Sequence, residues 1–248
     1  MPNRTLPSMS APHFFVEDLG EDDAELSEAD TRHAVRSLRL RPGDEVSLAD
    51  GRGVVGRGTL RGERNGLAVV QIEEVARVAR HGTEISVAFA PPKGDRLSWA
   101  VQKLSELGVD ETVLMPTARS VREVRPERSD QALARLRAVA REAAMQSRQP
   151  FVMAVSDGGS FEECLATGGT PAIMLAHSGK RGLMGLLPVE AEAVRVLIGP
   201  EGGWTDQETE AARRSGVGLW SLGPSVLRTE TAAVVGGALV LAHVGRLG

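Results

Sequence analysis

Residues 197–205 read Leu-Ile-Gly-Pro-Glu-Gly-Gly-Trp-Thr, and they carry the strongest local signal in the sequence. The apolar run Val194–Ile198 enters it, and the capping-box pattern Thr205-Asp-Gln-Glu208 follows. The order predicts a buried strand, a glycine-rich turn and a capped helix. In open parallel sheets, ligands bind at the carboxyl ends of strands, where glycines let the backbone approach them closely. The alternative is a tight strand-to-helix turn without a ligand.

The glycine spacing of this turn argues against two common nucleotide-binding sites. It is neither the GxGxxG pattern of dinucleotide-binding proteins nor a Walker loop. A dehydrogenase or a nucleoside triphosphatase is therefore disfavoured.

A second loop follows about twenty residues later, with the sequence Leu222-Gly-Pro-Ser-Val-Leu-Arg-Thr-Glu-Thr-Ala-Ala233. Thr229 and Glu230 suit the start of a helix, because a threonine caps it and a glutamate complements its positive end. Arg228 does not, because the helix dipole disfavours a cation there. We interpret Arg228 as facing an anionic partner, such as a phosphate or a developing anion; the alternative is an ordinary surface arginine.

Strands and helices alternate on both sides of these loops. The expected strands are ISVAFA, TVLMP, AIMLA, VRVLI and LWSL, in residues 85–90, 112–116, 172–176, 194–198 and 219–222. The expected helices cover 97–107, ended by Gly108, then 130–147, one begun by the capping box at 205–208, and 231–244. Such alternation predicts an α/β fold with a parallel sheet covered on both faces.

The first part of the chain has a different rhythm. Short strands punctuated by glycine are expected in EVSLAD, VVGRGTL and LAVVQIEEV, up to about Val78. They predict a small β-rich domain with the character of an open barrel. Before them, residues 31–40 are expected to form a short helix whose arginines lie on one face. We therefore divide the chain into domains 1–78 and 79–248.

Composition limits the possible functions. The 248 residues carry a net charge of −4, with eight acidic residues in 17–30 and eight arginines against four acidic residues in 32–64. A local basic face is thus expected within an acidic protein. Cys164 is the only cysteine, so a disulfide framework is excluded, and no cluster at ligand spacing suggests a metal. No signal peptide or long apolar run is found, which predicts a cytoplasmic protein without a membrane span.

The two loops together resemble the 16S ribosomal RNA uridine-N3 methyltransferase family of the SPOUT superfamily. Further matches are FFV near the start, RHAVRSLRLRPGD, the QKLSELGV helix and EAAMQS. The resemblance runs from about His13 to the C-terminus. It implies a PUA- or OB-like N-terminal barrel that binds RNA, and a SPOUT domain with a trefoil knot. It also implies a homodimer that acts on 16S rRNA, within the 30S subunit.

The resemblance further implies that S-adenosyl-L-methionine binds in three loops, 175–177, 198–203 and 222–232. The residues assigned to this site are Leu175, His177, Ile198, Gly199, Pro200, Glu201, Gly202, Gly203, Leu222, Gly223, Val226, Leu227, Arg228, Thr231 and Ala232.

Methylation of uridine N3 sets its own chemical demands. The N3 proton must leave, because a neutral imide nitrogen is a poor nucleophile. Arg228 is our candidate for stabilising the uracil anion, because a guanidinium stays protonated. Glu230 and Glu201 are the candidate general bases, with capping and loop structure as their alternative roles. The candidate RNA-binding residues are Arg32, His33, Arg36, Arg39, Lys93, Arg96, Lys103 and Arg119.

Two other readings stay open. One keeps the SPOUT class but changes the target, to a transfer RNA or a ribose hydroxyl. The other is a ribosome-assembly module that binds RNA without catalysis, and binding of S-adenosylmethionine would separate it from an enzyme.

Overall fold

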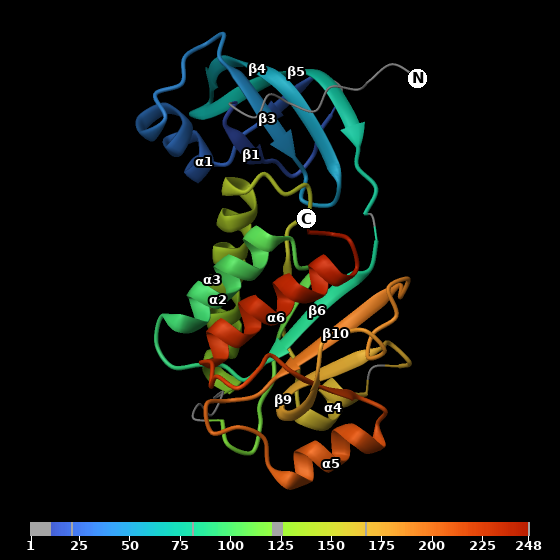
Figure 1. The fold of residues 1–248 in the computed structure, drawn as a ribbon. Coiled ribbons are helices and arrows are strands. Elements are labelled where there is room, and N and C mark those ends of the chain that lie inside the picture. Colours follow the sequence, from blue (N-terminus) through green and yellow to red (C-terminus); the bar gives the residue numbers. More distant parts are fainter. Residues whose placement is uncertain (1–10, 21, 81, 121–125, 167, 248) are drawn as a thin grey trace. The chain divides into compact units, whose positions relative to one another are not determined.

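The computed structural model describes residues 11–247 except 21, 81, 121–125 and 167. Contacts divide the chain into two units, and each is described by itself. The first unit comprises Met1–Arg80 with Ala144–Val152, and the second comprises His81–Ala143 with Met153–Gly248 (Figure 1). The segment Ala144–Val152 lies outside the range 1–78 expected from the sequence for the first domain.

The first unit is built on a five-stranded sheet with the order β1-β3-β4-β5-β2. Its strands are β1 (His13–Phe15), β2 (Asp23–Glu25), β3 (Glu45–Ala49), β4 (Val54–Arg64) and β5 (Leu67–Arg77). Only the β1–β3 pair is parallel. Phe14, Val46, Leu48 and Val70 share one buried cluster. This sheet confirms the expectation that the first part of the chain is rich in β-strands.

The strand β2 lies in the acidic stretch, where no strand was expected. Ala24 is its only buried residue, between exposed Asp23 and Glu25. Two charged residues on one face of an edge strand are a common protection against aberrant pairing. A single apolar residue between two charged ones is too short a pattern to reveal this strand from the sequence.

The expected helix at residues 31–40 was placed wrongly. Helix α1 spans Glu28–Arg32 and continues as the π-helix η1, His33–Ser37. It begins earlier because the Ser27 side chain accepts a hydrogen bond from the Asp30 backbone N–H. It ends earlier because Arg39 has a φ of 57°, which an α-helix does not accommodate.

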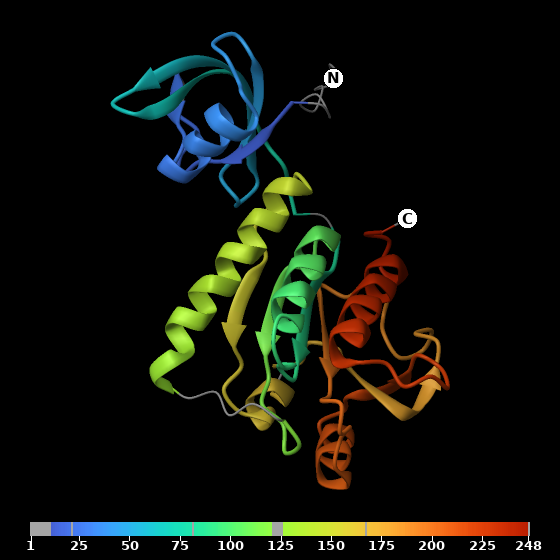
Figure 2. The same ribbon diagram turned by 90° about the vertical axis from the view of Figure 1, so that its left-hand side faces the viewer.

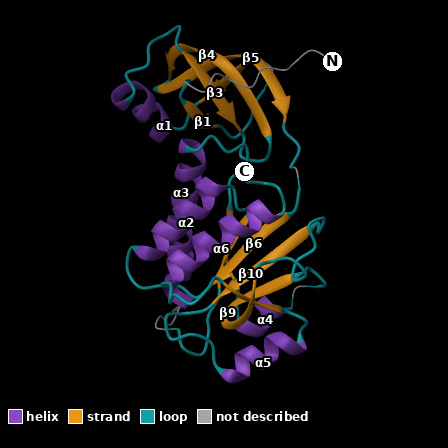
Figure 3. Cartoon of the chain, in the orientation of Figure 1, coloured by secondary structure: helices purple, strands orange, loops and turns teal. Residues whose placement is uncertain are grey.

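The second unit contains a six-stranded parallel sheet with the order β11-β9-β10-β6-β7-β8. Its strands are β6 (Glu84–Phe89), β7 (Glu111–Leu114), β8 (Ala154–Asp157), β9 (Ala172–Arg181), β10 (Ala193–Ile198) and β11 (Gly218–Ser221). Its helices are α2 (Arg96–Leu107), α3 (Pro126–Gln146), α4 (Phe161–Leu165), α5 (Asp206–Arg214) and α6 (Thr229–His243). Figure 3 shows the helices around the strands of this unit.

Helices cover both faces of this sheet, as the alternation of strands and helices along the sequence predicted. Val87 and Phe89 of β6 belong to one buried cluster with residues of α2, α3 and α6. Ala88 points the other way, into a cluster with residues of α4 and α5. Figure 2 shows α2 and α6 running alongside each other, in green and red.

The strands and helices expected in this unit are found, most of them within a few residues of the expected bounds. Gly108 ends α2 in the left-handed conformation, with a φ of 81°. The strand β8 and the short helix α4 were not expected. Among the described residues, none of the helices combines the length and apolar composition that crossing a membrane would need.

Candidate functional site

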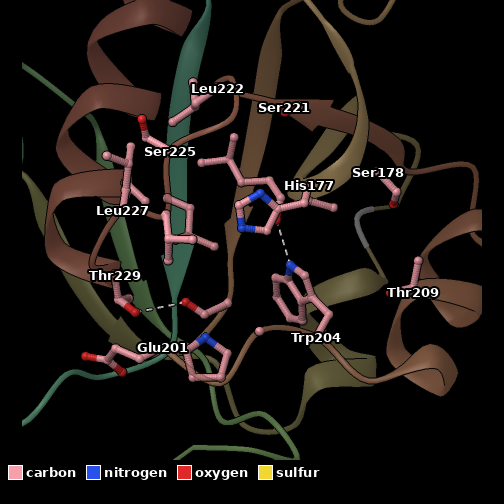
Figure 4. A pocket seen from close by; sticks show the side chains of 18 of the residues that line it. His177, Ser178, Glu201, Trp204, Thr209, Ser221, Leu222, Ser225, Leu227 and Thr229 are labelled. Atoms are coloured by element: carbon pink, nitrogen blue, oxygen red, sulfur yellow. Dashed lines mark hydrogen bonds between the residues drawn. The ribbon is translucent and has the colours of Figure 1, made fainter.

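A cavity of about 690 Å³ opens at an interruption within β9 and at the carboxyl ends of β10 and β11. One face of α5 and the start of α6 line its remaining sides (Figure 4). Parallel strands direct their carboxyl ends to the same edge, so the loops that follow them converge there. The sequence placed both glycine-rich loops after strands, and the structure brings them together at this edge.

The first wall of the cavity comes from an interruption within β9. The pairing of β9 with β11 jumps from Met174–Leu219 to Lys180–Trp220. The five residues in between, 175–179, leave this ladder, and four of them line the cavity. Gly179 is needed where the strand returns, because a Cβ there would lie 2.5 Å from the Trp220 backbone N.

The second wall is the turn 199–204 after β10, which Trp204 fastens to the first wall. The Trp204 indole N–H donates to the Leu175 carbonyl oxygen over 2.7 Å. The indole also packs on Phe161, with ring centroids 5.5 Å apart. Gly199 permits this arrangement, because a Cβ there would come within 2.9 Å of the indole.

The third wall is the loop after β11, which a hydrogen bond of Thr229 joins to the second wall. The buried Thr229 hydroxyl donates to the Gly199 carbonyl oxygen over 3.0 Å. Leu227 and Thr229 line the cavity, whereas Arg228 between them is exposed. The backbone at Arg228 is extended, with φ −68° and ψ 154°, so successive side chains point in opposite directions.

The fourth wall is α5, which the predicted capping box starts. The Thr205 side chain accepts from the Glu208 backbone N–H, and the Glu208 carboxylate accepts from the Thr205 backbone N–H. Glu208 also accepts from the backbone N–H of Ala118 over 2.9 Å, which ties the loop after β7 to this helix. The capped start therefore fixes which face of α5 reaches the cavity.

Twelve of the fifteen residues assigned to the cofactor line this cavity. Gly202, Arg228 and Thr231 are not among the lining residues. The lining residues that the assignment lacked are Ala176, Ser178, Trp204, Asp206, Thr209, Glu210, Arg213, Ser221, Ser225 and Thr229. The α5 residues recur at steps of three and four after a capping box, which is the signal that would have found them.

The two candidate bases occupy different environments. Glu201 is exposed and lines the cavity, whereas Glu230 is 6% exposed and does not. Arg96 lies between them, with Nη1 3.5 Å from Glu201 Oε1 and Nε 3.9 Å from Glu230 Oε1. Glu230 Oε2 is buried without a hydrogen-bond partner in the described part of the chain. Arg96, assigned to RNA from the sequence, thus contacts both carboxylates.

The other candidate RNA contacts separate into two groups. Arg32, His33, Arg36 and Arg39 are all exposed on α1, η1 and the turn that follows. In the second unit, Lys93 is exposed, but Lys103 and Arg119 have partners within the protein.

The partners of Lys103 and Arg119 suggest structural roles. Lys103 Nζ pairs with Glu106 over 2.7 Å. Arg119 donates to the carbonyl oxygens of Gly202 and Trp204, over 2.8 and 3.3 Å, and so supports the second wall of the cavity.

Metal binding and catalysis by the cysteine thiol find no support in the described residues. No group of three or more His, Cys, Asp and Glu side chains in that part of the chain lies close enough to hold a metal ion. Burial raises the pKa of the Cys164 thiol to about 11, so this side chain stays protonated and a weak nucleophile.

The sequence matches two protein families. Residues 79–241 match the RNA methyltransferase domain, and residues 26–73 match the RNA methyltransferase PUA domain. Ribosomal RNA small subunit methyltransferase E of Mycobacterium bovis is 32% identical over 217 residues, which cover 82% of this chain and 80% of the relative. The protein of the same name from Bacillus subtilis is 28% identical and covers 82% of this chain and 83% of the relative.

Solved structures agree with these matches. A Ribosomal RNA small subunit methyltransferase E from Neisseria gonorrhoeae, bound to S-adenosyl methionine, superposes with a TM-score of 0.82 at 25% identity. The match covers 94% of this chain and 97% of that one. A methyltransferase from Legionella pneumophila has the same fold, with a TM-score of 0.85 at 24% identity over 94% and 98% of the two chains. The chain therefore belongs to the ribosomal RNA small subunit methyltransferase E family, with a PUA domain and a parallel-sheet RNA methyltransferase domain.

Proposed function

We propose that this protein transfers a methyl group from S-adenosylmethionine to N3 of a uridine in 16S ribosomal RNA. The observation that carries the proposal is the cavity at the interruption of β9 and the ends of β10 and β11, within the domain that the family shares. The relatives' name supports small-subunit RNA as the substrate, and the bound ligand of the Neisseria structure supports the cofactor.

The cavity suits the adenosine part of this cofactor. Leu175, Ile198, Leu222 and Leu227 provide apolar surface for a flat base. Gly203 and Gly223 have φ values of 67° and 116°, so the loop backbone exposes N–H and C=O groups without side chains in the way. Apolar surface for a flat base, beside polar groups that orient the ligand, is typical of cofactor sites.

The chemistry divides between the cofactor and the chain. When bound, S-adenosylmethionine supplies the electrophilic methyl group. Glu201 is the candidate base that faces the cavity, and its carboxylate would accept the N3 proton. Arg96 orients that carboxylate, and the buried Glu230 in turn orients Arg96.

Arg228 is our candidate for stabilising the uracil anion at O2 or O4. Its guanidinium is exposed, follows the lining residue Leu227, and has no hydrogen bond or ion pair among the described residues. A free cation beside the cavity mouth is available to a substrate that approaches from solvent.

RNA binding would use the exposed group on the first unit, which consists of Arg32, His33, Arg36 and Arg39. Val35 and Leu38 are exposed beside them, so the same surface offers apolar contact to unstacked bases. Lys93 would add a contact on the second unit. Many small phosphate contacts of this kind make binding sensitive to salt.

Three finer features belong to the proposal as well. We expect the strands of the first unit to close as a barrel, in a domain that ends at residue 78. We expect a trefoil knot in the second, where β9 lies between β10 and β11 although it precedes both. We expect a homodimer, which the exposed Trp99 on α2 and Leu239 on α6 support.

Methyl transfer from labelled S-adenosylmethionine to 30S subunits that lack the modification tests the function directly. We expect 3-methyluridine after nucleoside analysis of the 16S RNA. If the protein bound the cofactor but formed a different methylated nucleoside, that nucleoside would replace uridine N3 as the target. Absence of both binding and transfer would favour a ribosome-assembly module.

Arg228→Ala tests the catalytic assignment. We expect cofactor affinity close to that of the unchanged protein, because Arg228 does not line the cavity, and turnover lowered about 100-fold or more. The measurements are calorimetric titration and single-turnover methyl transfer. Unchanged turnover would remove Arg228 from the mechanism.

A further inference from the structure

One wall of the cavity differs chemically from the other three. Asp206, Thr209, Glu210 and Arg213 of α5 all line it. Their spacing of three, four and seven residues places them on one face of the helix. The strand-end loops opposite contribute mainly apolar side chains and backbone. Apart from Glu201, the charged side chains that line the cavity are therefore gathered on α5.

The charges on this face form a defined set. Arg213 Nη1 lies 3.7 Å from Glu210 Oε2, and Asp206 is exposed one turn earlier. The face thus presents two carboxylates and one guanidinium. In Figure 4, Thr209 of this face and Ser178 lie on the opposite side of the cavity from Leu227 and Thr229.

We propose that this face of α5 binds the amino-acid end of S-adenosylmethionine, an inference that rests on the proposed function. That end and the adjoining sulfur carry two cations, the ammonium and the sulfonium, and one carboxylate. Two carboxylates and one guanidinium on α5 complement them in sign and number. The apolar loops would take the adenosine, so the ligand would lie across the cavity with its charged end on α5.

An RNA phosphate is the other ligand that Arg213 would attract. The two carboxylates on the same face oppose it, because like charges a few ångströms apart repel. They favour a ligand with more positive than negative charges. The cofactor has this property and a phosphodiester does not.

The same helix provides a matched control. Arg214 follows Arg213 but lines a separate hollow, together with Gln207, Glu208 and Ala211 on the other face of α5. Arg214→Ala removes the same kind of side chain from the same turn without touching the cavity. Its effect measures what loss of any arginine does to the helix.

The experiment compares two ligands by calorimetric titration. S-adenosylmethionine has the amino-acid end, and 5′-methylthioadenosine lacks it. We expect Arg213→Ala and the double variant Asp206→Asn/Glu210→Gln to weaken S-adenosylmethionine binding roughly 10-fold. Binding of 5′-methylthioadenosine should stay within about twofold, and Arg214→Ala should leave both ligands unaffected.

Three outcomes would overturn the proposal: equal losses for both ligands, no loss for either, or a loss of RNA affinity alone in Arg213→Ala. Binding of 5′-methylthioadenosine also reports that each variant is folded. If the unchanged protein bound neither ligand, the proposed function itself would fail, which is a different result from failure of the α5 assignment.

Discussion

Thr229→Val tests whether a single hydrogen bond holds the cofactor loops together. The substitution replaces a hydroxyl by a methyl group of similar size, so packing around this buried side chain changes little. What it removes is the hydrogen bond to the Gly199 carbonyl oxygen, which joins the loop after β11 to the turn after β10. Thr229→Ser keeps the hydroxyl and loses only the methyl group, and it is the control.

The magnitude follows from the environment of that bond. A hydrogen bond of this type contributes about 1 kcal/mol net. Gly199 lines the cavity, so water can reach its freed carbonyl and the larger penalty of a dry unpaired acceptor does not apply. The unfolding free energy should fall by about 1 kcal/mol, which lowers the melting temperature by about 2–4 °C. If the same bond positions the loops for the ligand, affinity for S-adenosylmethionine should fall about fivefold.

The assay is thermal unfolding and calorimetric titration of both variants beside the unchanged protein. We expect Thr229→Ser to keep its cofactor affinity and Thr229→Val to bind the cofactor about fivefold more weakly. Equal affinities in the two variants would refute the reasoning, because the hydroxyl would then have no part in shaping the site.

Three further predictions concern other contacts. Arg119→Ala should weaken cofactor binding several-fold, because the carbonyls of the turn after β10 lose their support, and titration with S-adenosylmethionine measures it. Burial, with a smaller effect from the charge of Arg148, lowers the pKa of His13 to about 4. The unfolded chain therefore binds this proton at a higher pH than the folded protein does. The contribution of neutral His13 to the free energy of unfolding is fully present above pH ~6.5, and about 3 kcal/mol of it should be lost as the pH falls towards 4. Denaturant unfolding at several pH values checks this, and His13→Gln should show a smaller loss. Replacing Arg32, Arg36 and Arg39 by alanine should lower the salt dependence of RNA binding, by about 0.7 in the slope of log K against log salt for each lost phosphate contact. An unchanged slope would exclude them from the RNA surface.

The sequence alone predicted the architecture of the second unit and that its two glycine-rich loops follow strands of the sheet. Apolar runs separated by helical periodicity indicate a parallel sheet covered on both faces. Glycine-rich turns after two of those runs mark the strand ends where ligands bind. These signals are local, because strand burial, turn conformation and capping depend on residues close together in the chain.

The first unit was predicted less completely. Its glycine-punctuated strands were found, but the helix before them was placed wrongly, because the cap at Ser27 and the positive φ at Arg39 were not recognised. The segment Ala144–Val152 joins this unit from far along the chain. No local pattern reveals such a partner, because its apolar residues would suit either unit.

The assembly of the site depends on contacts between segments that lie far apart in the sequence. The break in β9 depends on its pairing with β11, so the sequence of β9 alone could not show that residues 175–179 leave the ladder. The α5 wall depends on the rotation of that helix, and the role of Arg96 depends on two carboxylates more than a hundred residues away. Contacts between distant segments follow from sheet order and helix packing, which many sequences of the same local pattern would satisfy differently.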